Sequence, residues 1–479
     1  MATRDAQPNF MNLKSLPVNT AQKIESDVLE SLTFSQSEAV WEFAPKGFLH
    51  PGTKISLGLK ANGANGFPFL ATGVYSLIRR AVLRTTAGRV ICDTDSFNYL
   101  EGIKSLAIKN SSQKEREQYI SGKCVDFEVI YDEDSSTKST NGYGLSNGRE
   151  YNQSTPTTTG PLGLSPKQFS RNNKTPVYSV ALHQLFPYLK EGNQLPLYLM
   201  PNERIQVVLF WDNNNGKNDQ QNRLAIADGG TADVAVELDR NECKVIADYV
   251  FFDGESMAQF AEDNKELTFS YFDYRLSTQS LDATNASPAD NATVKQPVRN
   301  IGGQGMYVTK VYAGYENPNH SETNLLGRFT GTGMAVSAGG DARQALESNL
   351  FINSQFMYPQ TITNSARQYH NLKETLGMVP FCTRQSYSGE GEGGIITTGV
   401  NGDYAGRRQD TNLTHKFFYQ GFLTRGLNQR VDARGIDIHL KAPLATLGGS
   451  TIKSYTQRAW LEIRRYVTIT DGHLECYYV

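Results

Sequence analysis

Residues 181–211 read ALHQLFPYLKEGNQLPLYLMPNERIQVVLFW, a stretch in which a helical pattern is followed by a strand pattern. Its first part carries four apolar residues at the spacing of one helical face: Leu182, Leu185, Phe186 and Leu189. This spacing predicts a short amphipathic helix, and Gly192 can adopt the left-handed conformation that often ends helices. In residues 203–211, Ile205, Val207 and Leu209 then alternate with Arg204, Gln206 and Val208, which predicts a strand that is buried on one face and partly on the other.

The size and composition of the chain indicate two β-domains. Its 479 residues are 39% hydrophobic and 20% charged. A single β-domain often runs to about 200–250 residues, so this length predicts two domains. The 24 tyrosines, 23 phenylalanines and 42 glycines are typical of aromatic-rich strands that are joined by turns.

The charge balance and the distribution of apolar residues exclude several classes. The chain has 47 basic and 49 acidic residues, which argues against nucleic acid as a main partner, and we expect no sequence-specific nucleic-acid binding. The N-terminus lacks a continuous apolar core, so we expect no signal peptide. We also expect no transmembrane helix, because no apolar run approaches the necessary length of about 18–20 residues. Five scattered cysteines without a CxxC pair predict reduced, buried thiols: Cys92, Cys124, Cys243, Cys382 and Cys476.

Alternating apolar residues continue on both sides of the central stretch. Before it we expect strands at 38–43, 53–59 and 74–83 and a short helix at 97–106. After it we expect strands at 232–238 and 244–252 and a short helix at 257–261. Residues 135–175 are polar, and we interpret them as an excursion at one end of a sandwich.

The second half of the chain repeats the first. Residues 305–315 match 74–83 in position, and the helical segment 369–376 resembles 99–106. Residues 418–423 mirror the opening of the central stretch, and 435–440 mirror its strand. The closing segments YVFFDG (249–254) and YVTITDG (466–472) are the clearest match. We therefore predict two similar β-domains in tandem, at 34–262 and 263–479.

Residues 1–33 form a predicted N-terminal arm. Several of its apolar residues fit one face of a short helix: Ile24, Val28, Leu29 and Leu32. One interpretation is a terminus that docks on its own domain, and the other is an arm that locks a neighbouring molecule. On the second interpretation, the residues of the assembly arm are Asn19, Ile24, Val28, Leu29 and Leu32.

No motif supplies a converging set of catalytic groups, so we predict no enzyme, no cofactor and no catalytic or metal site. The seven histidines lack the spacing of metal ligands. Asp93 and Asp95 could suit a glycosidase, and the loops with Tyr143 and Tyr151 keep a polysaccharide-binding or hydrolysing protein as an alternative. We interpret the basic pairs as outward-facing strand ends or salt bridges between subunits: Arg79-Arg80, Arg407-Arg408 and Arg464-Arg465.

Several of these segments resemble a known family. LPLYL (195–199) with ERIQV (203–207) resembles the family's LPL segment and following strand, and DYVFFD (248–253) with MAQFA (257–261) resembles its junction between domains. Residues 97–106 resemble the helix after its early strands. The chain thus resembles the double-jelly-roll major capsid proteins of double-stranded DNA viruses, which include nucleocytoplasmic large DNA viruses, virophages and polinton-like viruses.

The resemblance implies an all-β fold of two tandem eight-stranded jelly-roll domains, with short helices in the connecting loops. In such a fold, the central stretch would place its helix between the F and G strands and then form a long G strand. The resemblance also implies a structural protein of the virion that is made and assembled in the host cell. Three copies would form a pseudo-hexameric capsomer of an icosahedral shell. The partners would be other copies, penton and minor capsid proteins, or an internal membrane. A trimeric viral spike is a further alternative.

Overall fold

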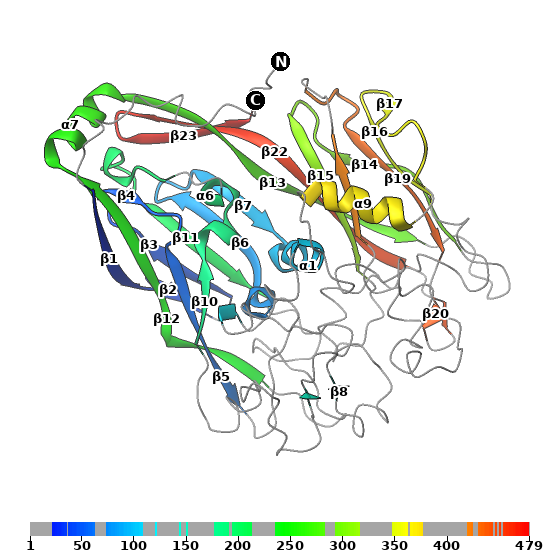
Figure 1. Cartoon of the computed structure of the whole chain (residues 1–479), viewed down its shortest axis with the longest axis horizontal. Helices are drawn as coiled ribbons and strands as arrows, with labels where there is room; N and C mark the ends of the chain where they lie inside the picture. The colour runs from blue at the N-terminus through cyan, green and yellow to red at the C-terminus, as the bar shows by residue number, and fades with distance from the viewer. Residues whose placement is uncertain are drawn as a thin grey trace.

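The structure is a computed structural model (Figure 1). It describes residues 22–35, 37–62, 73–108, 120–121, 143–144, 150–151, 177–190, 194–212, 235–282, 293–316, 347–362, 365–376, 419–424, 430–443, 446–447, 450–451 and 454–478. Predictions for residues 1–21, for Cys124 and Cys382, and for most of 135–175 lie outside these residues.

The first half of the chain forms two antiparallel sheets. One has the strand order β1-β12-β5-β10, and the other has the order β2-β3-β11-β6-β7. The strands are β1 (Gln22–Glu30), β2 (Thr33–Phe34), β3 (Glu38–Glu42), β4 (Phe48–Leu49), β5 (Lys54–Asn62), β6 (Ile78–Thr85), β7 (Val90–Asp95), β10 (Val177–Ala181), β11 (Ile205–Trp211) and β12 (Ala235–Phe252). The short strands β2 and β4 are additions to a set of eight main strands.

The pairing of these eight strands is nested. The first strand pairs with the last (β1 with β12), the second with the seventh (β3 with β11), the third with the sixth (β5 with β10), and the fourth with the fifth (β6 with β7). This is the pattern of a long hairpin rolled into two facing sheets, which is a jelly roll. The central stretch therefore connects the sixth and seventh strands, G and H, so its predicted place between F and G is wrong.

The second half has the same pairing. Its main strands are β13 (Glu266–Asp282), β14 (Thr293–Gly302), β15 (Val308–Glu316), β16 (Glu347–Ile352), β17 (Gln355–Phe356), β18 (Tyr419–Leu423), β19 (Ile436–Pro443) and β22 (Ser454–Thr470), followed by β23 (His473–Tyr478). β13 pairs with β22, β14 with β19, β15 with β18, and β16 with β17. The prediction of two tandem eight-stranded jelly rolls is confirmed.

The repeat is real, but two of the predicted matches between halves are shifted. Residues 305–315 contain the third strand, β15, whose counterpart is β5 rather than the fourth strand β6. Residues 418–423 contain the sixth strand, β18, whose counterpart is β10 rather than the helical opening of the central stretch. These matches are wrong because short strands have similar amino-acid compositions. The place of a strand in the roll depends instead on which distant strand it pairs with.

Helices occupy connections in both rolls. α1 (Phe97–Ile108) and α9 (Ser365–Leu376) each follow the fifth strand, as the predicted repeat requires. α7 (Gly254–Asp263) lies between the rolls, and the Asp253 carboxylate caps it by accepting a hydrogen bond from the Ser256 N–H at 2.9 Å. The proposed domain boundary at 262/263 falls at the end of this helix and stays a prediction. None of the described helices has the length and apolar character needed to cross a bilayer.

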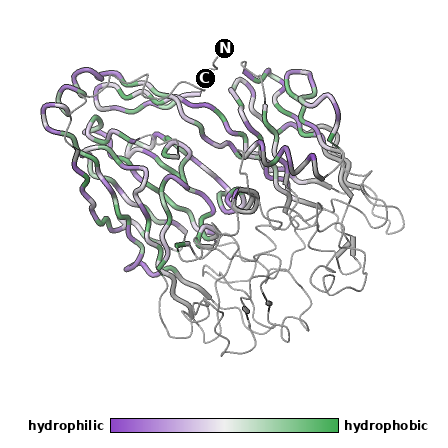
Figure 2. Tube along the Cα trace, in the orientation of Figure 1, coloured by the Kyte–Doolittle hydropathy of each residue, from purple (hydrophilic) through white to green (hydrophobic). Residues whose placement is uncertain are grey.

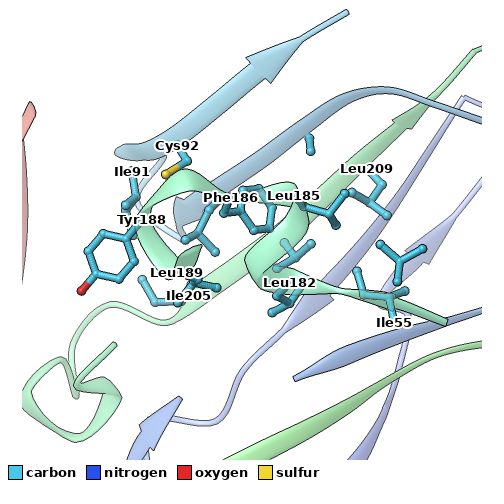
Figure 3. Packing of buried hydrophobic residues seen from close by; sticks show 14 of the residues in the cluster. Ile55, Ile91, Cys92, Leu182, Leu185, Phe186, Tyr188, Leu189, Ile205 and Leu209 are labelled. Carbon is cyan, nitrogen blue, oxygen red and sulfur yellow. The ribbon is translucent and has the colours of Figure 1, made fainter. Parts of the chain in front are cut away.

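The central stretch folds into two one-turn helices instead of one. α5 (Leu182–Leu185) ends at Phe186, whose backbone is extended, and α6 (Pro187–Lys190) starts at Pro187, whose fixed φ suits a first helical position. Figure 3 shows the apolar side chains of both helices pointing into one cluster with Ile55 and Cys92.

The strand that follows is central in its sheet, because β11 pairs with β3 on one side and with β6 on the other. Ile205, Val207 and Leu209 point into the roll and are fully buried. Val208 is also buried, on the opposite face, where it packs against Val40 and Val82. The strand is thus apolar on both faces, and Figure 2 shows the hydrophobic colour concentrated on such inner strands.

The close packing of α9 on β18 leads to a first prediction. A Cβ at Gly421 would lie 2.9 Å from the Leu372 Cα atom and 3.0 Å from the Thr375 Cβ atom. Gly421→Ala should therefore lower the free energy of unfolding by about 1–3 kcal/mol through overpacking. Chemical denaturation of both proteins measures this. The control is Gly254→Ala, where an added Cβ meets nothing within 4 Å. Equal effects of the two substitutions would contradict the prediction.

Candidate assembly surfaces

The first surface is the outer face of β1, an edge strand that pairs only with β12 within its sheet. Ile24 and Val28 lie on this face, with side chains that are 56% and 62% exposed, and Leu32 beyond the strand is 60% exposed. Large aliphatic side chains normally point into a sandwich. Their outward position marks this face as a candidate surface for association.

The helix predicted over this segment is wrong, because residues 22–30 form a strand of the first roll. Ile24, Val28 and Leu32 are four residues apart, a spacing that places them on one face of either a helix or a strand. Leu29 would share that face in a helix, but in the strand it points inward and packs partly buried against the core. Asn19 lies outside the described residues.

The polar groups beside this aliphatic row are already paired. The Ser26 hydroxyl donates a hydrogen bond to the Asp248 carboxylate of β12 at 2.5 Å. At the end of the strand, the Lys244 Nζ lies 3.6 Å from the Glu30 carboxylate. Ile246 of β12 is paired with Val28 and is itself exposed, so it extends the row onto the second strand.

The second surface is the contact between the two rolls. β7 is the edge strand of its sheet, and edge strands leave backbone groups unpaired. Here the second roll supplies partners for them. Arg465 Nη1 and Nη2 donate to the carbonyls of Ile91 and Val90 at 2.8 and 2.9 Å, and Trp460 Nε1 donates to the Asp95 carbonyl at 3.0 Å. The second roll therefore closes the open edge of the first.

A buried ion pair organises this contact. Arg465 Nη1 lies 2.8 Å from the Asp273 Oδ2 atom, and both side chains are almost completely buried. Asp273 Oδ1 also accepts hydrogen bonds from the backbone N–H groups of Tyr274 at 2.9 Å and Asp93 at 3.3 Å. Burial raises the pKa of Asp273 to about 6, although the charge of Arg465 opposes this shift. The pair thus joins β13 and β22 to the edge of β7.

Aromatic side chains pack beside the ion pair. The Tyr188 ring of α6 lies 5.4 Å from the Phe269 ring and 5.2 Å from the Tyr271 ring, both on β13 (centroid distances). The Tyr271 hydroxyl donates to the Ile91 carbonyl. One apolar cluster consequently runs from the first roll into the second, and the central stretch contributes to both the first core and the contact between rolls.

The residues considered for chemistry each have other partners in the structure. Asp93 accepts two hydrogen bonds from Arg80, and Asp95 accepts one from the Ser96 N–H. Tyr143 and Tyr151 are partners across a two-stranded ladder, β8 (Tyr143–Gly144) with β9 (Glu150–Tyr151). Within the described ranges, no group of three or more His, Cys, Asp or Glu side chains could hold a metal ion.

The described cysteines are free thiols. Cys92 and Cys243 are buried, as predicted, whereas Cys476 is only half-buried. Burial raises the pKa of Cys92 and, to about 12, that of Cys243, which keeps both protonated.

The basic pairs differ from one another. Arg80 forms an ion pair with Asp93 near the surface, but Arg465 is buried, so its predicted outward position is wrong. Sequence reasoning missed Asp273 and Arg465 as partners. The sequence indicates only that one strand carries an acidic residue and another, 192 positions away, carries a basic residue, which does not show that the two form a pair. Arg407 and Arg408 lie outside the described residues.

Comparison by sequence finds no relatives, since no family model matches this chain and no curated protein matches it either.

Comparison by structure does find similar proteins. The crystal structure of PBCV-1 VP54, fitted into a cryo-EM reconstruction of the virophage Sputnik, aligns with a TM-score of 0.56 at 10% identity. The alignment covers 97% of this chain and 99% of that one. A chain of the Sputnik virophage structure aligns with a TM-score of 0.54 at 12% identity, covering 97% and 90%. This chain has the fold of those viral chains. The likeness extends over both jelly rolls, because almost the whole length aligns.

Proposed function

We propose that this protein is a major capsid protein that assembles as a homotrimer into pseudo-hexameric capsomers of an icosahedral, double-stranded DNA virus shell. The observation that carries the proposal is the repeated nested pairing, which gives one chain two rolls of the same strand order joined by a buried contact. Three such chains present six similar wedges around one axis, and closed cyclic assemblies of this kind repeat one interface. The structurally similar PBCV-1 chain belongs to a virus capsid.

The proposed protein acts through shape and interfaces, with no catalytic step. Its location would be the virion, after synthesis and assembly inside a host cell. Its further partners would be penton and minor capsid proteins, or an internal membrane. We retain residues 1–33 as the proposed assembly arm, of which residues 22–30 pair with β12 in the same chain.

The second prediction concerns the solution mass of the purified protein. The monomer has a mass of 53.2 kDa, and a closed trimer would have about 160 kDa. Light scattering after size exclusion should give the trimer mass across a range of protein concentrations. Negative-stain images should then show particles with a hexagonal outline. A monomer at all concentrations would contradict the proposal, and a trimer with an elongated outline would favour a spike.

A further inference from the structure

We propose that one sheet of the second roll opens as a unit while the rest of the chain stays folded. This outer sheet is the four-stranded sheet β14-β19-β16-β17, and the sheet that it faces, β13-β22-β15-β18, is here called the inner sheet. Figure 1 shows the outer sheet at the right end of the molecule, whereas β13 and β22 of the inner sheet reach back over the first roll. The inference concerns motion within one chain, so it does not depend on the proposed function.

The buried apolar residues form a larger and a smaller cluster, and the outer sheet contributes only to the smaller one. The larger cluster contains the core of the first roll. It continues into the second half of the chain at Leu267, Phe269, Tyr271, Tyr274, Tyr312, Leu372, Trp460, Val467, Ile469 and Leu474, none of which lies on the outer sheet. The smaller cluster consists of Ile301, Val308, Val311, Ala313, Leu350, Ile352, Ile362, Phe422, Val431, Ile436, Ile438, Ala459, Leu461 and Ile463.

The inner sheet is therefore held by both clusters. Each buried apolar residue of β13 that the structure describes belongs to the larger cluster. β22 contributes Leu461 and Ile463 to the smaller cluster, but Val467 and Ile469 to the larger one. The free energy of a local opening is lowest where few buried apolar contacts are broken. Loss of the smaller cluster alone frees the outer sheet, whereas release of the inner sheet also requires the loss of its contacts with the first roll.

The strand pairing shows the same difference between the two sheets. β13 and β22 pair without a register shift over the whole of Glu266–Asp282. The pairing of β14 with β19 shifts register twice, between Gln296 and Arg299 and between Asn300 and Gly302. Bulges of this kind leave residues unpaired and interrupt the ladder of hydrogen bonds. The outer sheet thus has a weaker ladder as well as the smaller cluster.

The turn between β16 and β17 adds strain to the outer sheet. Asn353 and Ser354 have φ angles of 50° and 64°, so both lie in the left-handed region. Asparagine tolerates this region, but serine pays a conformational cost there. A two-residue hairpin turn with both angles positive favours Asn-Gly. The strain at Ser354 lowers the stability of the hairpin at the edge of the outer sheet.

The polar links between the two sheets do not prevent opening. The buried Gln420 Nε2 atom of β18 donates a hydrogen bond to the Ser348 hydroxyl of β16 at 2.5 Å. Water can bond to both groups after the sheets separate, so such a bond contributes little net stability. The contact between the rolls, with Asp273 and Arg465, lies on the inner sheet and remains closed during this motion.

The third prediction is a difference in hydrogen exchange between the two sheets. Exchange of the full-length protein, followed by mass spectrometry of peptides, measures local opening under native conditions. Amides of β14, β16 and β19 should exchange at least about tenfold faster than those of β13 and β22. The amides of β13 and β22 should instead be protected like those of β7 and β11 in the first roll.

Two isoleucine substitutions test which cluster holds the outer sheet. Ile438→Ala removes part of a fully buried side chain of β19 in the smaller cluster. It should speed the exchange of β14, β16 and β19 by about 30-fold and leave β13 and β22 unchanged. The matched control is Ile469→Ala on β22, a side chain that is 2% exposed and belongs to the larger cluster. This control should leave the exchange of the outer sheet near the wild-type rate.

A stabilising substitution keeps the test valid if Ile438→Ala does not fold. Ser354→Gly relieves the strain in the turn and should slow the exchange of β16 and β19 by roughly fivefold. It also removes an exposed hydrogen bond that Arg434 Nη1 donates to the Ser354 hydroxyl at 2.7 Å, which contributes little at the surface. The exchange of β13 and β22 should not change.

Several results would overturn the inference. Equal exchange of both sheets in the wild-type protein would show that the second roll opens as one body. Faster exchange of β13 and β22 in Ile438→Ala, or an outer sheet whose exchange none of the substitutions changes, would contradict the assigned unit. An Ile469→Ala protein whose outer sheet opens as readily as that of Ile438→Ala would show that the larger cluster holds this sheet too.

Discussion

Replacing Arg465 by methionine is expected to lower the free energy of unfolding by about 3–5 kcal/mol, because it leaves a buried carboxylate without its counter-charge. Arg465 is the charged partner of Asp273 at 2.8 Å. It also donates hydrogen bonds to the carbonyls of Val90 and Ile91, which the substitution would leave without this donor. Urea denaturation monitored by tryptophan fluorescence measures the loss.

The neighbouring arginine provides the matched control. Arg464 places its guanidinium 5.6 Å from the Phe272 ring centroid, and Arg464→Met should cost about 0.5–1 kcal/mol. The double substitution Arg465→Met with Asp273→Leu removes both charges and should recover part of the stability lost in the single variant. An Arg465→Met protein as stable as Arg464→Met would contradict the structural role of the pair.

Replacing Tyr188 by alanine is expected to cost about 3–5 kcal/mol, since it removes a large buried ring at the meeting point of the rolls. The ring packs against Phe269 and Tyr271 of β13, and such aromatic pairs add to the energy of burial. We also expect the loss to weaken the coupling between rolls. Calorimetry should show the single unfolding transition broaden or divide into two.

A tyrosine at the surface serves as the comparison. Tyr477 of β23 stacks on the Tyr466 ring at 5.8 Å and remains exposed. Tyr477→Ala should change the midpoint of unfolding only slightly, because the residue buries little surface. If Tyr188→Ala were equally mild, the contact between α6 and β13 would contribute little to holding the rolls together.

Much of the fold could be predicted from local sequence pattern. The strand of residues 205–211, the helices after the fifth strands, and the paired closing segments 249–254 and 466–472 all appear in the structure, and the helical pattern of residues 182–190 appears as two short helices. Alternating apolar residues leave few ways to form a two-faced sandwich, and similar segments in the same order in both halves predict similar domains. The all-β class and the tandem arrangement could therefore be predicted from the residues and the family resemblance.

The candidate assembly surfaces could be predicted from the sequence only in part. The sequence identified Ile24, Val28 and Leu32 as an apolar row, but it predicted a helix for them. Spacings of four residues suit both a helix and a strand, and only the pairing of β1 with β12 distinguishes the two. Which residues face outward follows from that pairing, so the exposure of this row could not be read from its spacing.

By itself, the sequence determined most of the local elements, the tandem repeat and the absence of any recognisable catalytic motif, since these depend on patterns that can be read along the chain. The tertiary structure decided which strands pair, which face of β1 is exposed, and that Arg465 is buried against Asp273 and the edge of β7. The physical reason is that burial and pairing depend on partners far away in the chain. The environment of a charged or apolar side chain exists only after those partners have come together.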